Sequence, residues 1–133
     1  MTPISYHPDI PDACPPDTSQ PAKGVIFRAI PEMPIQPAHF LSNVELGKGS
    51  YSQKNCKHWG LSVWVTEADV VHAREMFPNS FARQHIVRTQ LAPEDGVMMH
   101  TASNKQPQHH TFWKAHELDL CARSTIAFEP EGP

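Results

Sequence analysis

Several segments of the chain show the apolar patterning that is typical of β-strands. Residues 24–30 (GVIFRAI) are rich in β-branched and aromatic side chains and end before Pro31, which predicts a strand. Residues 58–66 (HWGLSVWVT) predict a second strand, with apolar side chains at alternate positions on one face: Trp59, Leu61, Val63 and Val65. Three further strands are expected, at residues 83–91, 96–102 and 124–128, and residues 109–113 can return antiparallel beside the strand at 96–102. Their short connections predict an α+β fold built on a mostly antiparallel sheet of about five strands.

One helix is predicted with a defined beginning and end, over residues 66–77 (TEADVVHAREMF). Thr66 and Asp69 resemble a capping box, and Pro78 stops the helix. Residues 113–122 fit either a short helix or an alternating strand, and we favour the short helix.

Proline separates the beginning of the chain from the rest. Nine of the fourteen prolines lie within residues 1–37, and a proline lacks the backbone N–H that a central strand needs. We expect residues 1–23 to form an extended, Pro-rich arm and residues 24–133 to form a single domain.

Composition excludes some classes of function. An apolar fraction of 39% over 133 residues predicts a globular fold, and a net charge of −3 argues against binding of duplex nucleic acid. The apolar runs are too short for a membrane span. Three widely spaced cysteines (Cys14, Cys56 and Cys121) suggest reduced thiols and a cytoplasmic location, with a bacterial cell as the expected source.

Histidines near the end of the chain are candidates for acid–base chemistry. If residues 102–107 form a hairpin loop, His100 lies opposite His109, with the two side chains about 5 Å apart at Cβ. Such a pair could exchange protons in phosphodiester or glycosidic chemistry, and His110 belongs to the same stretch. The alternative is a histidine-rich rim of the domain that has no catalytic role.

A zinc site is a further alternative in the same region. Cys56 and His58 would face one side of an extended segment, and three later residues could complete the ligand set: His110, His116 and Cys121. The spacing matches no known zinc motif.

Three segments, taken in order, resemble the spaced arginine, serine and glutamate of ADP-ribosyltransferase-like domains: FRAI, GLSVW and HELD. The resemblance implies that Arg28 holds the phosphates of NAD and that Ser62 positions its nicotinamide side. It implies that Glu117 orients the ribose hydroxyl and stabilises the transition state. The family's S-T-S motif is reduced here to LSV, and its E-x-E motif becomes Glu117-Leu118-Asp119.

Aromatic residues suggest a binding function rather than an enzymatic one. Trp64 and Trp113 are candidates for an exposed surface, because tryptophan is enriched at interface hot spots. Together with the Pro-rich arm, they predict an accessory or binding protein that engages a protein partner or forms a homo-oligomer. An enzyme that uses NAD, a histidine-based hydrolase and a zinc site remain as alternatives, and the cofactor stays unknown.

Overall fold

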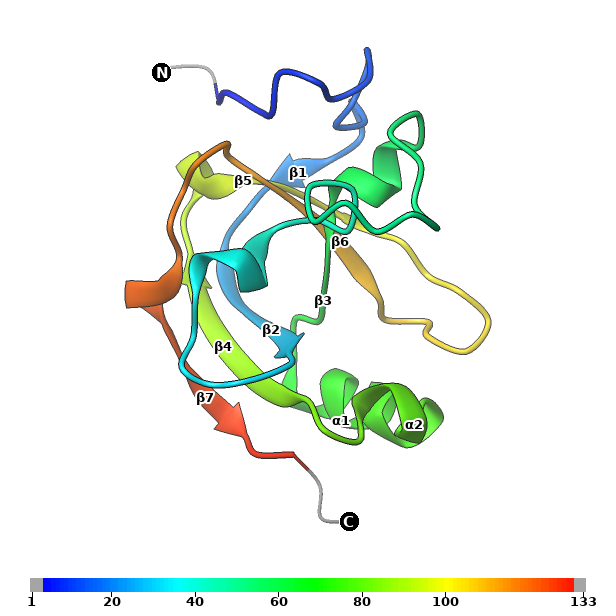
Figure 1. The fold of residues 1–133 in the computed structure, drawn as a ribbon, viewed down its shortest axis with the longest axis vertical. Helices are drawn as coiled ribbons and strands as arrows, with labels where there is room; N and C mark the ends of the chain where they lie inside the picture. The colour runs from blue at the N-terminus through cyan, green and yellow to red at the C-terminus, as the bar shows by residue number, and fades with distance from the viewer. Residues whose placement is uncertain (1–3, 131–133) are drawn as a thin grey trace.

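Two antiparallel sheets face each other in the computed structural model, which describes residues 4–130 (Figure 1). One sheet has the strand order β1-β5-β6-β3, and the other has the order β2-β4-β7. The strands are β1 (Gln20–Pro21), β2 (Gly24–Ile30), β3 (Leu61–Val63), β4 (His85–Leu91), β5 (Gly96–His100), β6 (His110–Lys114) and β7 (Ser124–Phe128). The helices are α1 (Glu67–Met76) and α2 (Pro78–Phe81), and the 3-10 turns are η1 (Pro37–Phe40), η2 (Cys56–Trp59), η3 (Pro93–Asp95) and η4 (Cys121–Arg123). The α+β class is confirmed, but the expected sheet of about five strands is instead two sheets.

Strand β2 is covered on both faces, which explains its nearly continuous apolar sequence. Ile26 and Ile30 point into the space between the two sheets, where they join the main core. Phe27 points to the opposite face and packs in a second core with Trp64 and with Val70 of α1. Phe27 and Trp64 also exchange backbone hydrogen bonds of 2.7 and 2.9 Å, which tie the two sheets together next to β3.

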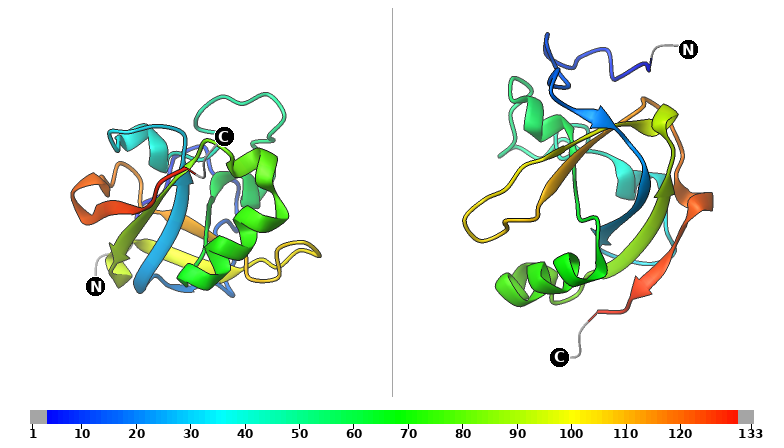
Figure 2. Two further views of the ribbon diagram at one scale, coloured as in Figure 1. Left: turned by 90° about the horizontal axis from the view of Figure 1, so that it is seen from below. Right: turned by 180° about the vertical axis from the view of Figure 1, so that it is seen from behind.

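Helix α1 forms where the sequence predicts it. The Thr66 hydroxyl accepts a hydrogen bond from the backbone N–H of Asp69 at 3.1 Å and so caps the first turn. The side chains of Val70 and Ala73 are almost fully buried against the second core. Both helices lie beside the lower end of the sheets (Figure 2). Within residues 4–130, no helix is both long and apolar enough to cross a membrane.

The short helix favoured for residues 113–122 is wrong. Residues up to Lys114 belong to β6, which pairs with β5 on one side and β3 on the other. Phe112 and Trp113 are 0% and 1% exposed, so both faces of this strand are covered. Pairing with two neighbouring strands therefore outweighs the local helical spacing. The strand predicted over 58–66 is likewise shorter, because its first residues form the 3-10 turn η2.

The Pro-rich arm is not extended over its described part. Three successive turns, closed by hydrogen bonds to the carbonyl oxygens of His7, Pro11 and Pro16, lead into β1. A disulfide joins Cys14 in the arm to Cys56 in η2, with 5.5 Å between the two Cα atoms. The arm is thus fixed to the domain, and the expectation of reduced thiols is wrong for Cys14 and Cys56.

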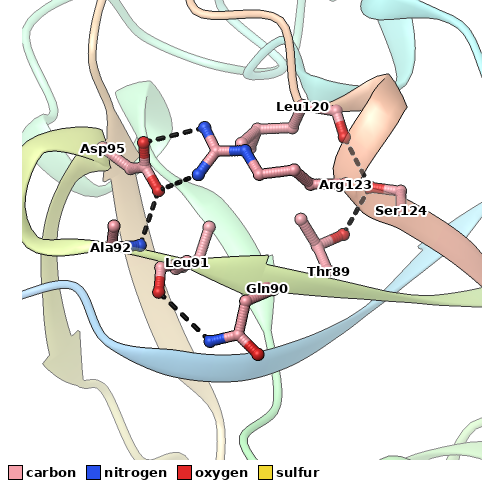
Figure 3. Close-up of polar contacts among 8 residues, drawn as sticks. All are labelled: Thr89, Gln90, Leu91, Ala92, Asp95, Leu120, Arg123 and Ser124. Carbon is pink, nitrogen blue, oxygen red and sulfur yellow. Dashed lines mark hydrogen bonds and ion pairs between the residues drawn. The ribbon is translucent and has the colours of Figure 1, made fainter.

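An ion pair between the buried Asp95 and the partly exposed Arg123 holds the corner between β4 and β5 (Figure 3). The Asp95 carboxylate is 2% exposed and accepts two hydrogen bonds from the Arg123 guanidinium, of 2.7 and 2.9 Å. It also accepts the backbone N–H of Ala92 at 2.6 Å. These bonds raise the pKa of Arg123, since they favour its charged form. The pair fixes η4 beside the start of β5.

Candidate functional site

The candidate site is built around Ser62, the outward-facing residue of β3. Leu61 and Val63 are buried on the core side of this strand, so Ser62 points to the opposite side. The strand begins after Gly60, where an added Cβ would lie 2.1 Å from Cγ2 of Thr111. Glycine at this position lets β3 approach β6 closely, which places Ser62 directly across from Thr111.

His109 joins Ser62 to a chain of hydroxyl groups. Its Nε2 lies 2.9 Å from the Ser62 Oγ, and its Nδ1 lies 2.8 Å from the Thr101 Oγ1. The Thr101 Oγ1 is in turn 2.8 Å from the Thr111 Oγ1. The ring also contacts Trp64 edge-on, with 5.7 Å between the ring centroids. The imidazole is therefore held from three sides.

The pKa of His109 is lowered, chiefly because burial penalises the charged ring. A hydrogen bond with the backbone of Thr101 opposes this shift, while the nearby positive charges of Lys57 and two histidines add to it. A neutral imidazole carries one proton. When Nδ1–H donates to Thr101, Nε2 is free to accept the proton of the Ser62 hydroxyl. That is the arrangement that a general base requires.

Arg28 approaches Ser62 from the other sheet. It lies on the β2 face that also carries Ile26 and Ile30, so its side chain starts inside the protein. Its Nε donates to the carbonyl oxygen of His39 at 2.8 Å, and its Nη1 donates to that of Ser62 at 3.0 Å. Burial lowers the pKa of Arg28 to about 10, which leaves it charged at neutral pH. Among the residues that the structure describes, its Nη2 has no hydrogen-bond partner.

Two adjoining hollows of about 440 and 400 Å³ meet at this site. We call them together the cleft. Four residues line both hollows: Tyr51, Ser62, Gln106 and His109. Lys57 lines the first hollow, and Arg28 lines the second. Of the described residues, no aspartate or glutamate lines either one. A cleft with cations and no carboxylate favours an anionic ligand.

The predicted pairing of His100 with His109 is wrong by one residue. In the hairpin, His100 pairs with His110, and the two rings stack with centroids 4.8 Å apart. The backbone of His109 instead accepts a hydrogen bond from Thr101. Successive residues of a strand point to opposite faces, so His110 is on the other side of the sheet from the cleft. Of the three candidate histidines here, only His109 reaches Ser62.

The five residues of the predicted zinc site are not brought together. Cys56 is bonded to Cys14, which removes its thiolate as a ligand. His58 lines the cleft, whereas His116 packs against His7, with 5.0 Å between the ring centroids. Burial, together with Asp119, raises the pKa of the Cys121 thiol to about 11. Within residues 4–130, no group of three or more His, Cys, Asp or Glu side chains could hold a metal ion.

The structure brings together Arg28 and Ser62 but not Glu117. Ser62 lies across from Thr111 near the start of β6, whereas Glu117 follows the far end of that strand by three residues. Its carboxylate lies 3.8 Å from the His116 Nε2. The backbone N–H of His116 donates a hydrogen bond to the carbonyl oxygen of Ser5 in the arm. Glu117 therefore lines neither hollow of the cleft.

Trp64 and Trp113 are buried rather than exposed, at 4% and 1% of their surface. Trp64 packs against Phe81, and the Trp113 indole donates to the carbonyl oxygen of Cys56 at 3.0 Å. The expectation that these two side chains form a partner surface is wrong, because sheet packing and the disulfide-linked turn cover them.

Sequence reasoning did not find Thr101, Tyr51, Lys57 or Gln106 as site residues. Thr101 and Gln106 belong to the hairpin around residues 101–109, which projects from the sheets (Figure 1). Tyr51 belongs to the loop before η2, and Lys57 lies in η2 next to the disulfide-bonded Cys56. No sequence spacing indicates that these two loops meet. No known protein family, curated protein or solved structure matches the chain.

Proposed function

We propose that the protein is an enzyme that binds a phosphate-bearing small molecule in the cleft and acts on it through Ser62 and His109. The observation that carries this proposal is the 2.9 Å contact between His109 Nε2 and Ser62 Oγ in a cleft lined by cations and by no carboxylate of the described chain. A hydroxyl next to a neutral imidazole is the pairing that activates a nucleophile.

Each group of the site has a role in this chemistry. His109 takes the proton as the Ser62 Oγ attacks the phosphorus of the substrate, and it returns that proton to the leaving-group oxygen as the P–O bond to that group breaks. Water, deprotonated by the same imidazole, then hydrolyses the phosphoserine and frees Ser62. Thr101 is a positioning residue, because its hydroxyl sets which imidazole nitrogen carries the proton. Arg28 offers Nη2 to a phosphate oxygen, and Lys57 adds a second positive charge across the cleft.

Nucleotides are the first substrate class to test. The two hollows have room for a base or ribose beside a phosphate group, since ligand pockets typically span about 300–1,000 Å³. The contact of Arg28 with Ser62 also agrees with two of the three positions in the ADP-ribosyltransferase resemblance. The position of Glu117 does not support the third. A reaction that survives Glu117→Gln and fails in His109→Ala would separate our proposal from that resemblance.

Calorimetric titration with ADP, NAD and adenosine tests the binding step. We expect ADP to bind at least about tenfold more tightly than adenosine, because charge-assisted hydrogen bonds to phosphate are the strong ones. Lys57→Gln should weaken ADP binding about fivefold, whereas Lys54→Gln, a matched change outside the cleft, should not. Equal affinity for ADP and adenosine, or no saturable binding of either nucleotide at millimolar concentration, would refute the proposal.

We also propose that the protein works in an oxidising compartment rather than in a reducing cytoplasm. The support is the Cys14–Cys56 disulfide, since such bonds persist mainly outside reducing compartments. Differential alkylation of protein taken from its native source, without prior reduction, tests this. Finding Cys14 and Cys56 alkylated as free thiols would contradict it.

A further inference from the structure

A second hollow, which we call the back hollow, opens on the other side of β6 from the cleft. His109 and Thr111 line the cleft, whereas His110 lines the back hollow. Phe112 and Met98 belong to the core between the two sheets, and they pair across β5 and β6. Alternation along β6 places His110 on the same face as Phe112. The back hollow is therefore an opening at one end of the space between the sheets.

The floor of the back hollow is apolar. Its volume is about 650 Å³, and its apolar lining comes from several elements: Pro21, Val25, Val65, Met98 and Met99. Val65 is 37% exposed and Met98 is 9% exposed. The two methionines adapt to ligands of different shape, because their side chains are unbranched and polarisable. An apolar surface of this size would hold the hydrocarbon part of a small molecule.

The rim of the back hollow is polar and carries the positive charge of Lys23. Lys23 and the stacked pair of His100 and His110 line it, and no aspartate or glutamate of the described chain does. His110 Nδ1 donates to the carbonyl oxygen of Gln108 at 3.0 Å, and His100 Nε2 donates to that of Pro107. A carbonyl accepts only, so these nitrogens are the donors of the two rings.

We propose that the back hollow binds a small amphipathic anion, such as a medium-chain carboxylate, with its hydrocarbon part on the methionines and its charged group at Lys23. Charge complementarity selects this occupant, since a rim that carries Lys23 and no carboxylate of the described chain favours an anion. This site does not depend on the chemistry proposed for Ser62 and His109, and it is open on a different face of the sheet.

Titration of protein carrying ¹³C-methyl methionine with sodium octanoate, followed by NMR, tests the site. Of the five methionines, we expect saturable shifts at Met98 and Met99, assigned with Met98→Leu and Met99→Leu. Met33 and Met76, which are 44% and 43% exposed, serve as internal controls for non-specific contact and should not shift. Octanoate should bind about fivefold more tightly than octylammonium, which has the same chain and the opposite charge.

Two matched pairs of variants locate the binding. Val65→Asp should weaken octanoate binding by about tenfold or more, because it places a negative charge in the apolar wall. Ile126→Asp changes an equally exposed residue of β7 outside the back hollow and should leave binding unchanged. Lys23→Gln should weaken it about threefold, whereas Lys105→Gln should not.

Three results would overturn the proposal. One is the absence of saturable shifts at Met98 and Met99 up to millimolar octanoate. Another is equal affinity for octanoate and octylammonium, or parallel shifts at Met33 and Met76, which would mean non-specific apolar contact. The third is a change in the Met98 and Met99 signals with protein concentration alone, together with a dimeric mass in light scattering. That would mean that a second copy covers the back hollow.

Discussion

Removing the Cys14–Cys56 disulfide should destabilise the protein strongly. The bond closes a loop with a sequence separation of 42 residues. In the chain-entropy account, a loop of this length lowers the entropy of the unfolded chain by roughly 13 cal/mol/K, which is about 4 kcal/mol of stability at 25 °C. That is a large part of the 5–15 kcal/mol that is typical of a folded protein. We therefore expect Cys14→Ser/Cys56→Ser to lose about 4 kcal/mol.

Urea denaturation at 25 °C measures this loss. The double variant and the wild type treated with a reducing agent should unfold at similar, lower urea concentrations. Cys121→Ser is the matched control, because Cys121 is a free thiol, and its midpoint should stay near that of the wild type. A double variant within about 1 kcal/mol of the wild type would refute the entropic reasoning. The same treatment should weaken ADP binding, since Cys56 immediately precedes Lys57 in the wall of the cleft.

Three other changes test the fold and the site. Asp95→Ala should lower the free energy of unfolding by about 2 kcal/mol, because it removes the hydrogen bonds that the buried carboxylate accepts from Arg123 and from the Ala92 N–H, and calorimetric melting checks this. Gly96→Ala should cost about 3 kcal/mol in the same assay, since Gly96 has φ +150° and an added Cβ would lie 2.1 Å from the Trp113 carbonyl oxygen. The rate of any Ser62-dependent reaction should depend on pH with a midpoint below 6.5, the ordinary pKa of histidine. The rate should fall as the pH drops and His109 takes up a proton, because burial lowers the pKa of His109; a midpoint above pH 6.5 would contradict this.

Local sequence patterns correctly predicted the strands and the helix whose formation is determined mainly by their own residues. Strands β2, β4 and β7 form almost where alternation and the flanking prolines predict them, and α1 begins at its capping residue Thr66. Residues 113–122 were misassigned because their helical spacing is local, whereas strand pairing on both sides of β6 is not. The same pairing buries Trp113, which an isolated segment would expose.

The candidate site was only partly predictable, for a geometric reason. Arg28 and Ser62 were named from the sequence for one site, and His109 was named for another. A shift of one residue in the hairpin decides whether His109 or His110 faces His100, and strand periodicity cannot fix that shift without the turn. The disulfide was missed because three cysteines at wide spacing give no pairing signal.

The reactivity of Ser62 tests the central claim most directly. A fluorophosphonate mimics a phosphoryl electrophile, and a serine activated by a neutral imidazole attacks it at phosphorus and releases fluoride. We predict that mass spectrometry will find the label on Ser62 in the wild type, little label in His109→Ala, and an intermediate rate in Thr101→Val. Labelling that is absent from Ser62, or that proceeds equally well in His109→Ala, would contradict the account.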